Sequence, residues 1–170
     1  MASGKLGIGL IGAGRIGRVH GETIARRVPG AKLVTIYDVN GAAAETLAFE
    51  LGTSVSLSVE AVLNNPEVKA VAICSSTDTH APLIRQAAQA GKDIFCEKPI
   101  AADLAVIDDA LKVVEAAGVK LMIGFNRRFD PNYARVKQAI DSGEIGTPQL
   151  MHFISRDPAP PPVEYIKVSG

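Results

Sequence analysis

The stretch LGIGLIGAGRIG, residues 6–17, places an apolar run directly before three glycines that have the spacing GxGxxG. In a dinucleotide-binding fold the first glycine, Gly12, allows a tight turn, and the second, Gly14, lets the backbone approach a pyrophosphate. The third, Gly17, lets the following helix pack closely on the strand, and the N–H groups that begin this helix face the phosphates. The stretch therefore predicts a strand, a phosphate-binding turn and a helix.

An acidic residue at the expected distance strengthens this interpretation. Asp38 ends the apolar stretch KLVTIYD and lies 21 residues after Gly17, where such folds hold the adenine ribose. A carboxylate there accepts hydrogen bonds from both ribose hydroxyls and repels a 2′-phosphate, and neither Val39 nor Asn40 adds positive charge. NAD is therefore favoured over NADP. S-adenosylmethionine stays an alternative, because methyltransferases also combine a glycine turn with an acidic residue.

Short apolar runs alternate with helical patterns over residues 1–125. Most of the runs are continuous rather than alternating, as in strands of a parallel sheet that helices cover on both faces. The right-handed crossover rule then favours an α/β fold with a Rossmann-type doubly wound parallel sheet. Asn40, Thr79 and Asp103 are predicted to cap helices, and Gly118 is expected to end one. The predicted strands are residues 6–11, 32–38, 54–57, 70–74, 93–96 and 120–124.

The pattern changes in residues 126–170, which are predicted to be the truncated start of an α+β substrate domain. Asp130 and Pro131 are typical of a helix start. Residues 149–156 are expected to form a strand whose unpaired edge promotes self-association. Residues 157–170 contain too much proline for a helix or a central strand.

Composition limits the classes of partner. The chain has 18 basic and 18 acidic residues without a run of like charge, so neither nucleic acid nor an anionic membrane is an expected partner. No apolar segment approaches the ~20 residues of a membrane span, and the start lacks a signal-peptide core, so we expect a cytoplasmic protein. Cys74 and Cys96 fit neither a redox nor a zinc motif. They are expected to be buried thiols, and no metal site is predicted.

Polar residues after the fourth predicted strand are expected to line the other side of the cofactor crevice. In a doubly wound sheet, the loops after the first and fourth strands flank the point where ligands bind. Ser75, Ser76 and Thr77 are therefore predicted to contact the cofactor. His80 is either a cofactor contact or a surface residue of the next helix. His20 is expected to be a packed or surface histidine rather than a catalyst.

FCEKPI, residues 95–100, places Glu97 and Lys98 beside a proline at a strand end. This stretch, together with GAGRIG, Asp38 and CSSTDTH, resembles the Gfo/Idh/MocA family of oxidoreductases. The similarity covers essentially the whole chain. In the second half, GFNRRFDP and SRDPAPPP are similar to the branch of that family that oxidises inositol.

The resemblance implies an NAD-dependent dehydrogenase that oxidises a secondary hydroxyl of a cyclic polyol or sugar, with a homo-oligomeric full-length form. In this family the lysine of the EKP motif hydrogen-bonds the reacting hydroxyl, so that role passes to Lys98. As hydride leaves the carbon the hydroxyl must lose its proton, and a cation there favours the developing alkoxide. Glu97 is expected to orient Lys98 or to contact the cofactor ribose. The predicted cofactor-binding residues are Gly12, Gly14, Arg15, Ile16, Gly17, Asp38, Ser75, Ser76, Thr77, His80 and Glu97.

The sequence also departs from the family, because the aspartate and histidine that complete its proton relay would follow residue 170. Asn126, Arg127, Arg156 and Asp157 are substrate candidates by resemblance, with solvated polar residues as the alternative. We therefore expect the cofactor-binding part of an inositol-type dehydrogenase, catalytically incomplete by itself. A relative that acts on another sugar and a non-catalytic NAD-binding regulatory module are the alternatives.

Overall fold

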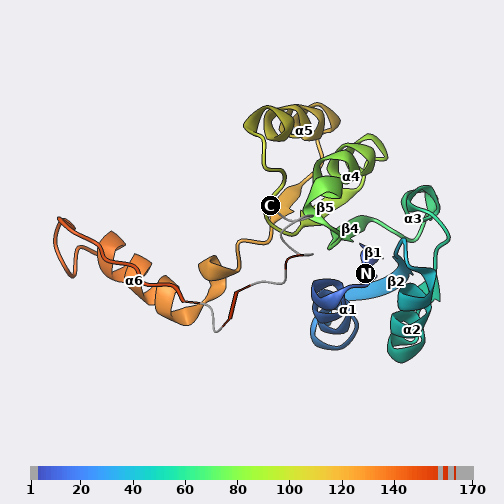
Figure 1. Ribbon diagram of the computed structural model, residues 1–170, viewed down its shortest axis with the longest axis horizontal. Helices are drawn as coiled ribbons and strands as arrows, with labels where there is room; N and C mark the ends of the chain where they lie inside the picture. Colours follow the sequence, from blue (N-terminus) through green and yellow to red (C-terminus); the bar gives the residue numbers. More distant parts are fainter. Residues whose placement is uncertain (1–3, 157–158, 161–162, 164–170) are drawn as a thin grey trace. The chain divides into compact units, whose positions relative to one another are not determined.

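The computed structural model describes residues 4–156, 159–160 and 163 (Figure 1). By its internal contacts the described chain divides into two compact units, with the boundary between Gly124 and Phe125. Within the described residues, every helix is too short or too polar to cross a membrane.

The first unit is built on a six-stranded sheet with the strand order β3-β2-β1-β4-β5-β6, in which all neighbouring strands are parallel. The order reverses between β1 and β4, which confirms the predicted Rossmann-type doubly wound sheet. The strands are β1 (Leu6–Ile11), β2 (Ala31–Tyr37), β3 (Ser54–Val55), β4 (Ala70–Ile73), β5 (Asp93–Cys96) and β6 (Leu121–Ile123). The helices of this unit are α1 (Arg15–Arg27), α2 (Gly41–Leu51), α3 (Val59–Asn64), α4 (Thr77–Gln89) and α5 (Leu104–Ala117).

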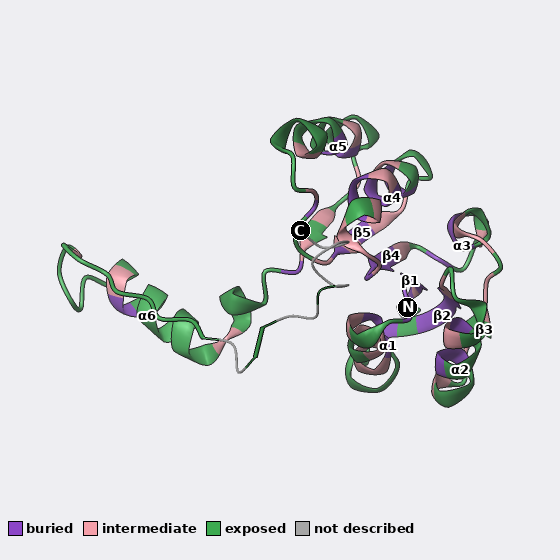
Figure 2. Cartoon of the chain, viewed as in Figure 1, coloured by how far each residue is buried: buried purple, intermediate pink, exposed green. Residues whose placement is uncertain are grey.

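Helices cover both faces of this sheet, and each face has its own apolar core (Figure 2). Successive residues of a strand point to opposite faces. Leu10 of β1 thus packs with Leu47 of α2 on one face, while Ile11 packs with Ile84 of α4 on the other. Burial on both faces explains why the strands read as continuous apolar runs.

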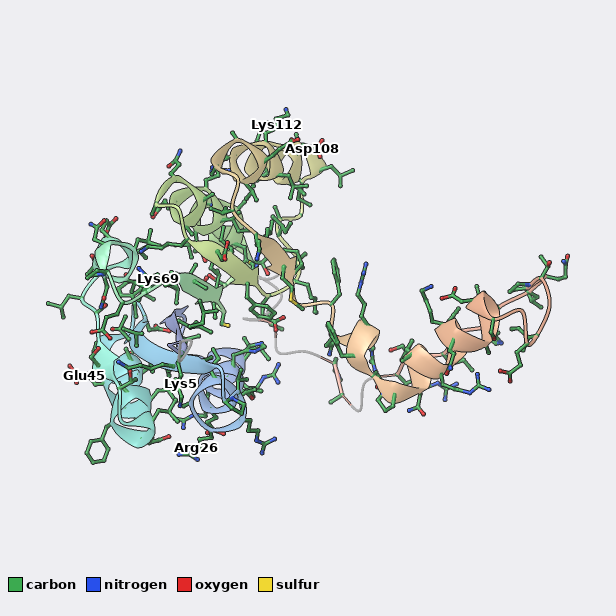
Figure 3. The ribbon with its side chains drawn as sticks, turned by 180° about the vertical axis from the view of Figure 1, so that it is seen from behind. Lys5, Arg26, Glu45, Lys69, Asp108 and Lys112 are labelled. Atoms are coloured by element: carbon green, nitrogen blue, oxygen red, sulfur yellow. The ribbon has the colours of Figure 1, made fainter. Side chains whose placement is uncertain are left out.

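Charged side chains lie on the outer surfaces of the helices and on the ends of strands. They project into solvent, as the labelled residues illustrate (Figure 3). These exposed residues are Lys5, Arg26, Glu45, Lys69, Asp108 and Lys112.

Two predicted caps of this unit are confirmed and one is wrong. The side chain of Asn40 accepts a hydrogen bond from the backbone of α2, and that of Asp103 accepts one from α5. The helix predicted to follow Thr79 instead begins at Thr77, after Ser76. The Thr79 hydroxyl donates to the Ser76 carbonyl at 2.7 Å and lies 2.6 Å from the Ser75 hydroxyl, so it lies within the first turn and does not cap the helix.

The second unit begins with a 3-10 turn, η1 (Asn126–Phe129), and continues with helix α6 (Pro131–Asp141). Asp130 caps α6 as predicted, because its Oδ1 accepts hydrogen bonds from the N–H groups of Asn132 and Tyr133 at 2.9 and 3.4 Å. The strand predicted over residues 149–156 is wrong: this segment has no strand conformation and is exposed. A strand needs a hydrogen-bonded neighbour, and the described part of this unit provides none. The edge expected to promote self-association is therefore absent as well.

Candidate cofactor-binding and catalytic site

The candidate site lies at the edge of the sheet where β1, β4 and β5 end. These three strands are neighbours, and Ile73 pairs with both Ile11 and Cys96. The ladder continues one residue further, because Cys74 N–H donates to the Ile11 carbonyl at 2.7 Å and Glu97 N–H donates to the Ile73 carbonyl at 2.9 Å. The glycine turn, the serine loop and the EKP stretch therefore leave the sheet side by side.

The three glycines of the motif are needed for different physical reasons. Gly12 has φ +104°, and a Cβ there would lie 2.6 Å from the backbone of Cys74. A Cβ at Gly17 would collide with the carbonyl oxygen of Gly12, whereas a Cβ at Gly14 would meet only open space. Gly12 and Gly17 are thus required by the fold, while the open side of Gly14 is where a pyrophosphate can approach the backbone.

Two helices present uncapped N-termini at this edge. α1 begins after Gly14 and α4 begins after Ser76, and neither has a side-chain hydrogen bond at its cap. The other α-helices that the structure describes have such a bond, from Asn40, Ser58, Asp103 and Asp130. An uncapped first turn leaves backbone N–H groups and the positive end of the helix dipole available to an anion. The two open helices are those that flank the reversal of strand order.

Asp38 is fixed at the end of β2 by backbone donors. Its Oδ2 accepts a hydrogen bond from Ala13 N–H at 2.6 Å, and its Oδ1 accepts one from Asn40 N–H at 2.7 Å. Each oxygen keeps acceptor capacity for a further donor, as two ribose hydroxyls would require. Val39 is 92% exposed and Asn40 is exposed as well, and neither adds positive charge beside the carboxylate. This donor and acceptor set fits an unphosphorylated adenine ribose.

His80 holds two loops together inside the protein. Only 2% of the residue is exposed, so its interpretation as a surface residue is wrong. Its Nδ1 lies 2.7 Å from the Pro99 carbonyl oxygen and its Nε2 lies 3.0 Å from that of Ser75. Both neighbours are carbonyl oxygens, so a neutral ring donates its single N–H to one of them. Ser75, like Ser76 and Thr77, is half-buried in the loop that opens α4.

Glu97 makes a contact that the sequence does not reveal. Its Oε1 accepts a hydrogen bond from Nε2 of His20 at 2.7 Å, and its Oε2 lies 3.3 Å from the backbone N–H of Lys98. The His20 ring also packs on Phe95, with 4.9 Å between ring centroids. Lys98 itself is exposed, and the Lys98–Pro99 peptide bond is cis. The only sequence signal for His20 is its position one helical turn after Gly17.

The two cysteines are buried free thiols, as predicted. Burial raises the pKa of both thiols, and the nearby Glu97 carboxylate raises it further; the pKa of Cys96 reaches about 12. A thiol that stays protonated is a poor nucleophile. Among the described residues, no three His, Cys, Asp or Glu side chains form a group that could hold a metal ion.

The predicted substrate contacts lie apart from this site in the chain, in the second unit. Asn126 and Arg127 are exposed on η1, Arg156 is exposed, and Asp157 lies outside the described residues. The Arg127 guanidinium stacks over the Tyr133 ring at 5.2 Å. This unit also contains a mainly apolar cavity of about 350 Å³. The cavity is lined by Asn132, Tyr133, Val136, Ile140, Ile145, Met151, His152 and Phe153.

Comparisons with known proteins identify the family of the chain. Residues 6–125 match the profile of the Gfo/Idh/MocA group, described as an oxidoreductase family with an NAD-binding Rossmann fold. Inositol 2-dehydrogenase of Rhizobium meliloti is 49% identical over 95% of this chain and 48% of its own length.

Two solved structures are also similar. Myo-inositol dehydrogenase from Corynebacterium glutamicum has a TM-score of 0.87 and 39% identity, covering 95% of this chain and 48% of that one. Scyllo-inositol dehydrogenase from Lactobacillus casei, solved with bound NAD(H) and scyllo-inositol, has a TM-score of 0.80 and 35% identity over 84% of this chain and 42% of that one. The chain thus spans about half the length of the curated relatives it matches. It belongs to the Gfo/Idh/MocA family of oxidoreductases and carries that family's NAD-binding Rossmann domain.

Proposed function

We propose that this chain is the cofactor-binding part of an NAD-dependent dehydrogenase that oxidises a secondary hydroxyl of a cyclic polyol of the inositol type. The observation that carries the proposal is the edge of the sheet where the open side of Gly14, the fixed carboxylate of Asp38 and the exposed Lys98 occur together. The printed names of the relatives, which are inositol dehydrogenases, support the substrate class.

Different residues at this edge are proposed to contact different parts of the cofactor. Backbone N–H groups of the turn from Gly14 to Gly17, with Arg15 and Ile16 in the first helical turn, would hold the pyrophosphate. Asp38 would accept both hydroxyls of the adenine ribose, which a 2′-phosphate would prevent by charge repulsion. The predicted contacts on the other side of the crevice are Ser75, Ser76, Thr77 and Glu97.

Lys98 is proposed as the catalytic residue. Bound NAD supplies the acceptor for the hydride that leaves the carbinol carbon. As the hydride leaves the carbon, the hydroxyl proton must pass to solvent or a general base, and the Lys98 ammonium would stabilise the developing alkoxide by donating a hydrogen bond from Nζ. The exposed position of Lys98, two residues after the end of β5, allows its flexible stem to reach a ligand at this edge.

The second unit is proposed to begin the substrate-binding part, so that residues 1–125 form the NAD-binding domain and residues 126–170 belong to the next one. Asn126, Arg127, Arg156 and Asp157 are proposed substrate contacts. They are polar groups that can hydrogen-bond the hydroxyls of a polyol.

Comparing NAD reduction by the unchanged protein and by Lys98→Ala tests this function. In the longest chain that the gene encodes, NAD is expected to be reduced in the presence of myo-inositol. Lys98→Ala is expected to lower that rate by about 10²-fold or more, as loss of a positioned acid–base group does, while NAD affinity is retained. Lys69→Ala removes an exposed lysine next to the other end of β4 and should change neither quantity.

The alternatives predict different outcomes. Turnover that survives in Lys98→Ala would contradict the role of this lysine. Faster turnover with another sugar would change the substrate but not the reaction. NAD binding without reduction by any polyol would instead support a non-catalytic NAD-binding module.

A further inference from the structure

We infer that His20 and His80 form a clamp that positions Lys98 by holding the residues on either side of it. Glu97 precedes Lys98 and contacts His20, while Pro99 follows it and contacts His80. The two histidines come from different helices, α1 and α4. Both are positioning residues, because each binds a neighbour of Lys98 rather than a reacting atom.

The His20 arm of the clamp fixes the Glu97 carboxylate from two sides. On one side, Nε2 of His20 donates to Oε1 over 2.7 Å, and the two side chains are only 26% and 16% exposed. On the other side the carboxylate packs on Gly124, where a Cβ would lie 3.1 Å from Oε1. Partial shielding from water strengthens a charge-assisted hydrogen bond. The carboxylate thereby stays within 3.3 Å of the Lys98 backbone N–H.

The His80 arm fixes the carbonyl of Pro99. The His80 ring is 2% exposed, and its other nitrogen contacts the Ser75 carbonyl at 3.0 Å. One side chain therefore joins the loop after β4 to the loop after β5. A buried ring packed between these two carbonyl groups has few alternative positions, whichever of them accepts its N–H, so this arm restricts where Pro99 lies.

The clamp ties the backbone on both sides of Lys98 to α1 and α4, the two helices proposed to face the cofactor. α1 and α4 are the helices with open N-termini at this edge, and each contributes one histidine. The lysine side chain is long and has many rotamers, so only its backbone can be held before a ligand binds. Holding a catalytic group in place lowers the entropy cost of reaching the reactive geometry. The benefit for catalysis rests on the function proposed above, whereas the clamp itself rests on these contacts.

Variants of His20 separate hydrogen bonding from packing. His20→Gln keeps an N–H donor near the place of Nε2, and His20→Phe keeps a ring against Phe95 but has no donor. His152→Gln is the matched control, because His152 is an exposed histidine in the second unit. ¹⁵N relaxation of the Lys98 amide in the 170-residue chain, measured without cofactor, reports how firmly its backbone is held.

The clamp predicts an order parameter near 0.85 for Lys98 in the unchanged chain, in His20→Gln and in His152→Gln, and a fall to about 0.6 or below in His20→Phe. A rigid Lys98 in His20→Phe would show that packing alone suffices and would overturn the proposal. If His20→Phe does not fold, Glu97→Ala removes the same bond from the other partner and must give the same loss. NAD titration of the unchanged chain tests the proposed function separately, so either idea can fail alone.

Discussion

Single residues at this site show which roles a sequence pattern can predict. The glycine spacing predicts Gly12, Gly14 and Gly17, because backbone geometry requires glycine whatever surrounds the motif. Asp38 is predicted because it lies 21 residues after Gly17, where such folds have an acidic residue. The contact between His20 and Glu97 could not be predicted, since it joins residues 77 positions apart that only the folded sheet brings together. His80 is similar, because its burial depends on the loop after β5.

Substitution of two of these glycines should separate folding from cofactor binding. Gly17→Ala places a Cβ against the Gly12 carbonyl and should lower the free energy of unfolding by about 1–3 kcal/mol. Gly14→Ala meets no atom within 4 Å, so stability should change little while NAD affinity falls at least about tenfold, because the Cβ occupies the approach of the pyrophosphate. Urea unfolding and calorimetric NAD titration measure the two effects.

Gly30 offers a control for this pair. A Cβ there also meets only open space, and the residue lies in the turn after α1. Gly30→Ala should leave NAD affinity as it is. Equal NAD affinity in Gly14→Ala and the unchanged chain would show that the pyrophosphate does not lie where the motif predicts.

The buried cysteines make stability depend on alkaline pH. Because burial raises the folded-state pKa of Cys74 and brings that of Cys96 to about 12, an unfolded chain loses these protons first as pH rises. The unfolded thiol has a pKa near 8.5, so stability is intact below about pH 8.5 and falls between there and about pH 12. The fall is at most about 1.4 kcal/mol per pH unit for each thiol.

Urea unfolding at pH 8 and pH 10 measures this effect. Replacing both cysteines by alanine should flatten the difference between the two pH values, although the double variant is less stable at both. An unchanged difference in that variant would mean that other groups cause the alkaline loss.

At the scale of elements, local capping chemistry predicts helix starts well where the cap acts alone. Asn40, Asp103 and Asp130 each accept a backbone hydrogen bond at the start of a helix, as the sequence indicates. Thr79 does not act as a cap, because its hydroxyl bonds to the Ser75 hydroxyl and the Ser76 carbonyl within the first turn. Helix α3 has only six residues, too few to show a periodic pattern. The strand predicted over residues 149–156 does not form, because a strand also needs a paired neighbour, which its own sequence cannot supply.

The caps of α5 and α4 should differ in their effect on stability. Asp103→Ala removes a 2.7 Å hydrogen bond to Ala105 N–H and should lower the free energy of unfolding by about 0.5–2 kcal/mol. Ser76→Ala removes a side chain that makes no cap bond and should cost much less. Chemical denaturation compares them directly. A larger loss in Ser76→Ala would show that the N-terminus of α4 is closed by its own side chain rather than open to a ligand.

At the scale of the whole molecule, the alternation of strands and helices predicts the parallel sheet and the edge at which ligands bind. The reversal between β1 and β4 brings the glycine turn, the serine loop and the EKP stretch together, although the serine loop begins 63 residues after Gly12 and the EKP stretch 85 residues after it. The second unit is less predictable. Its helix follows from Asp130 and Pro131, but the role of its polar residues depends on a substrate that only chemistry can identify.

Calorimetric titration of the 170-residue chain with NAD, NADP and S-adenosylmethionine tests the central claim most directly. The account predicts one NAD site per chain, binding of NADP weaker by at least about tenfold because its 2′-phosphate meets the Asp38 carboxylate, and no binding of S-adenosylmethionine. Absence of NAD binding, or tighter binding of either competitor, would contradict it.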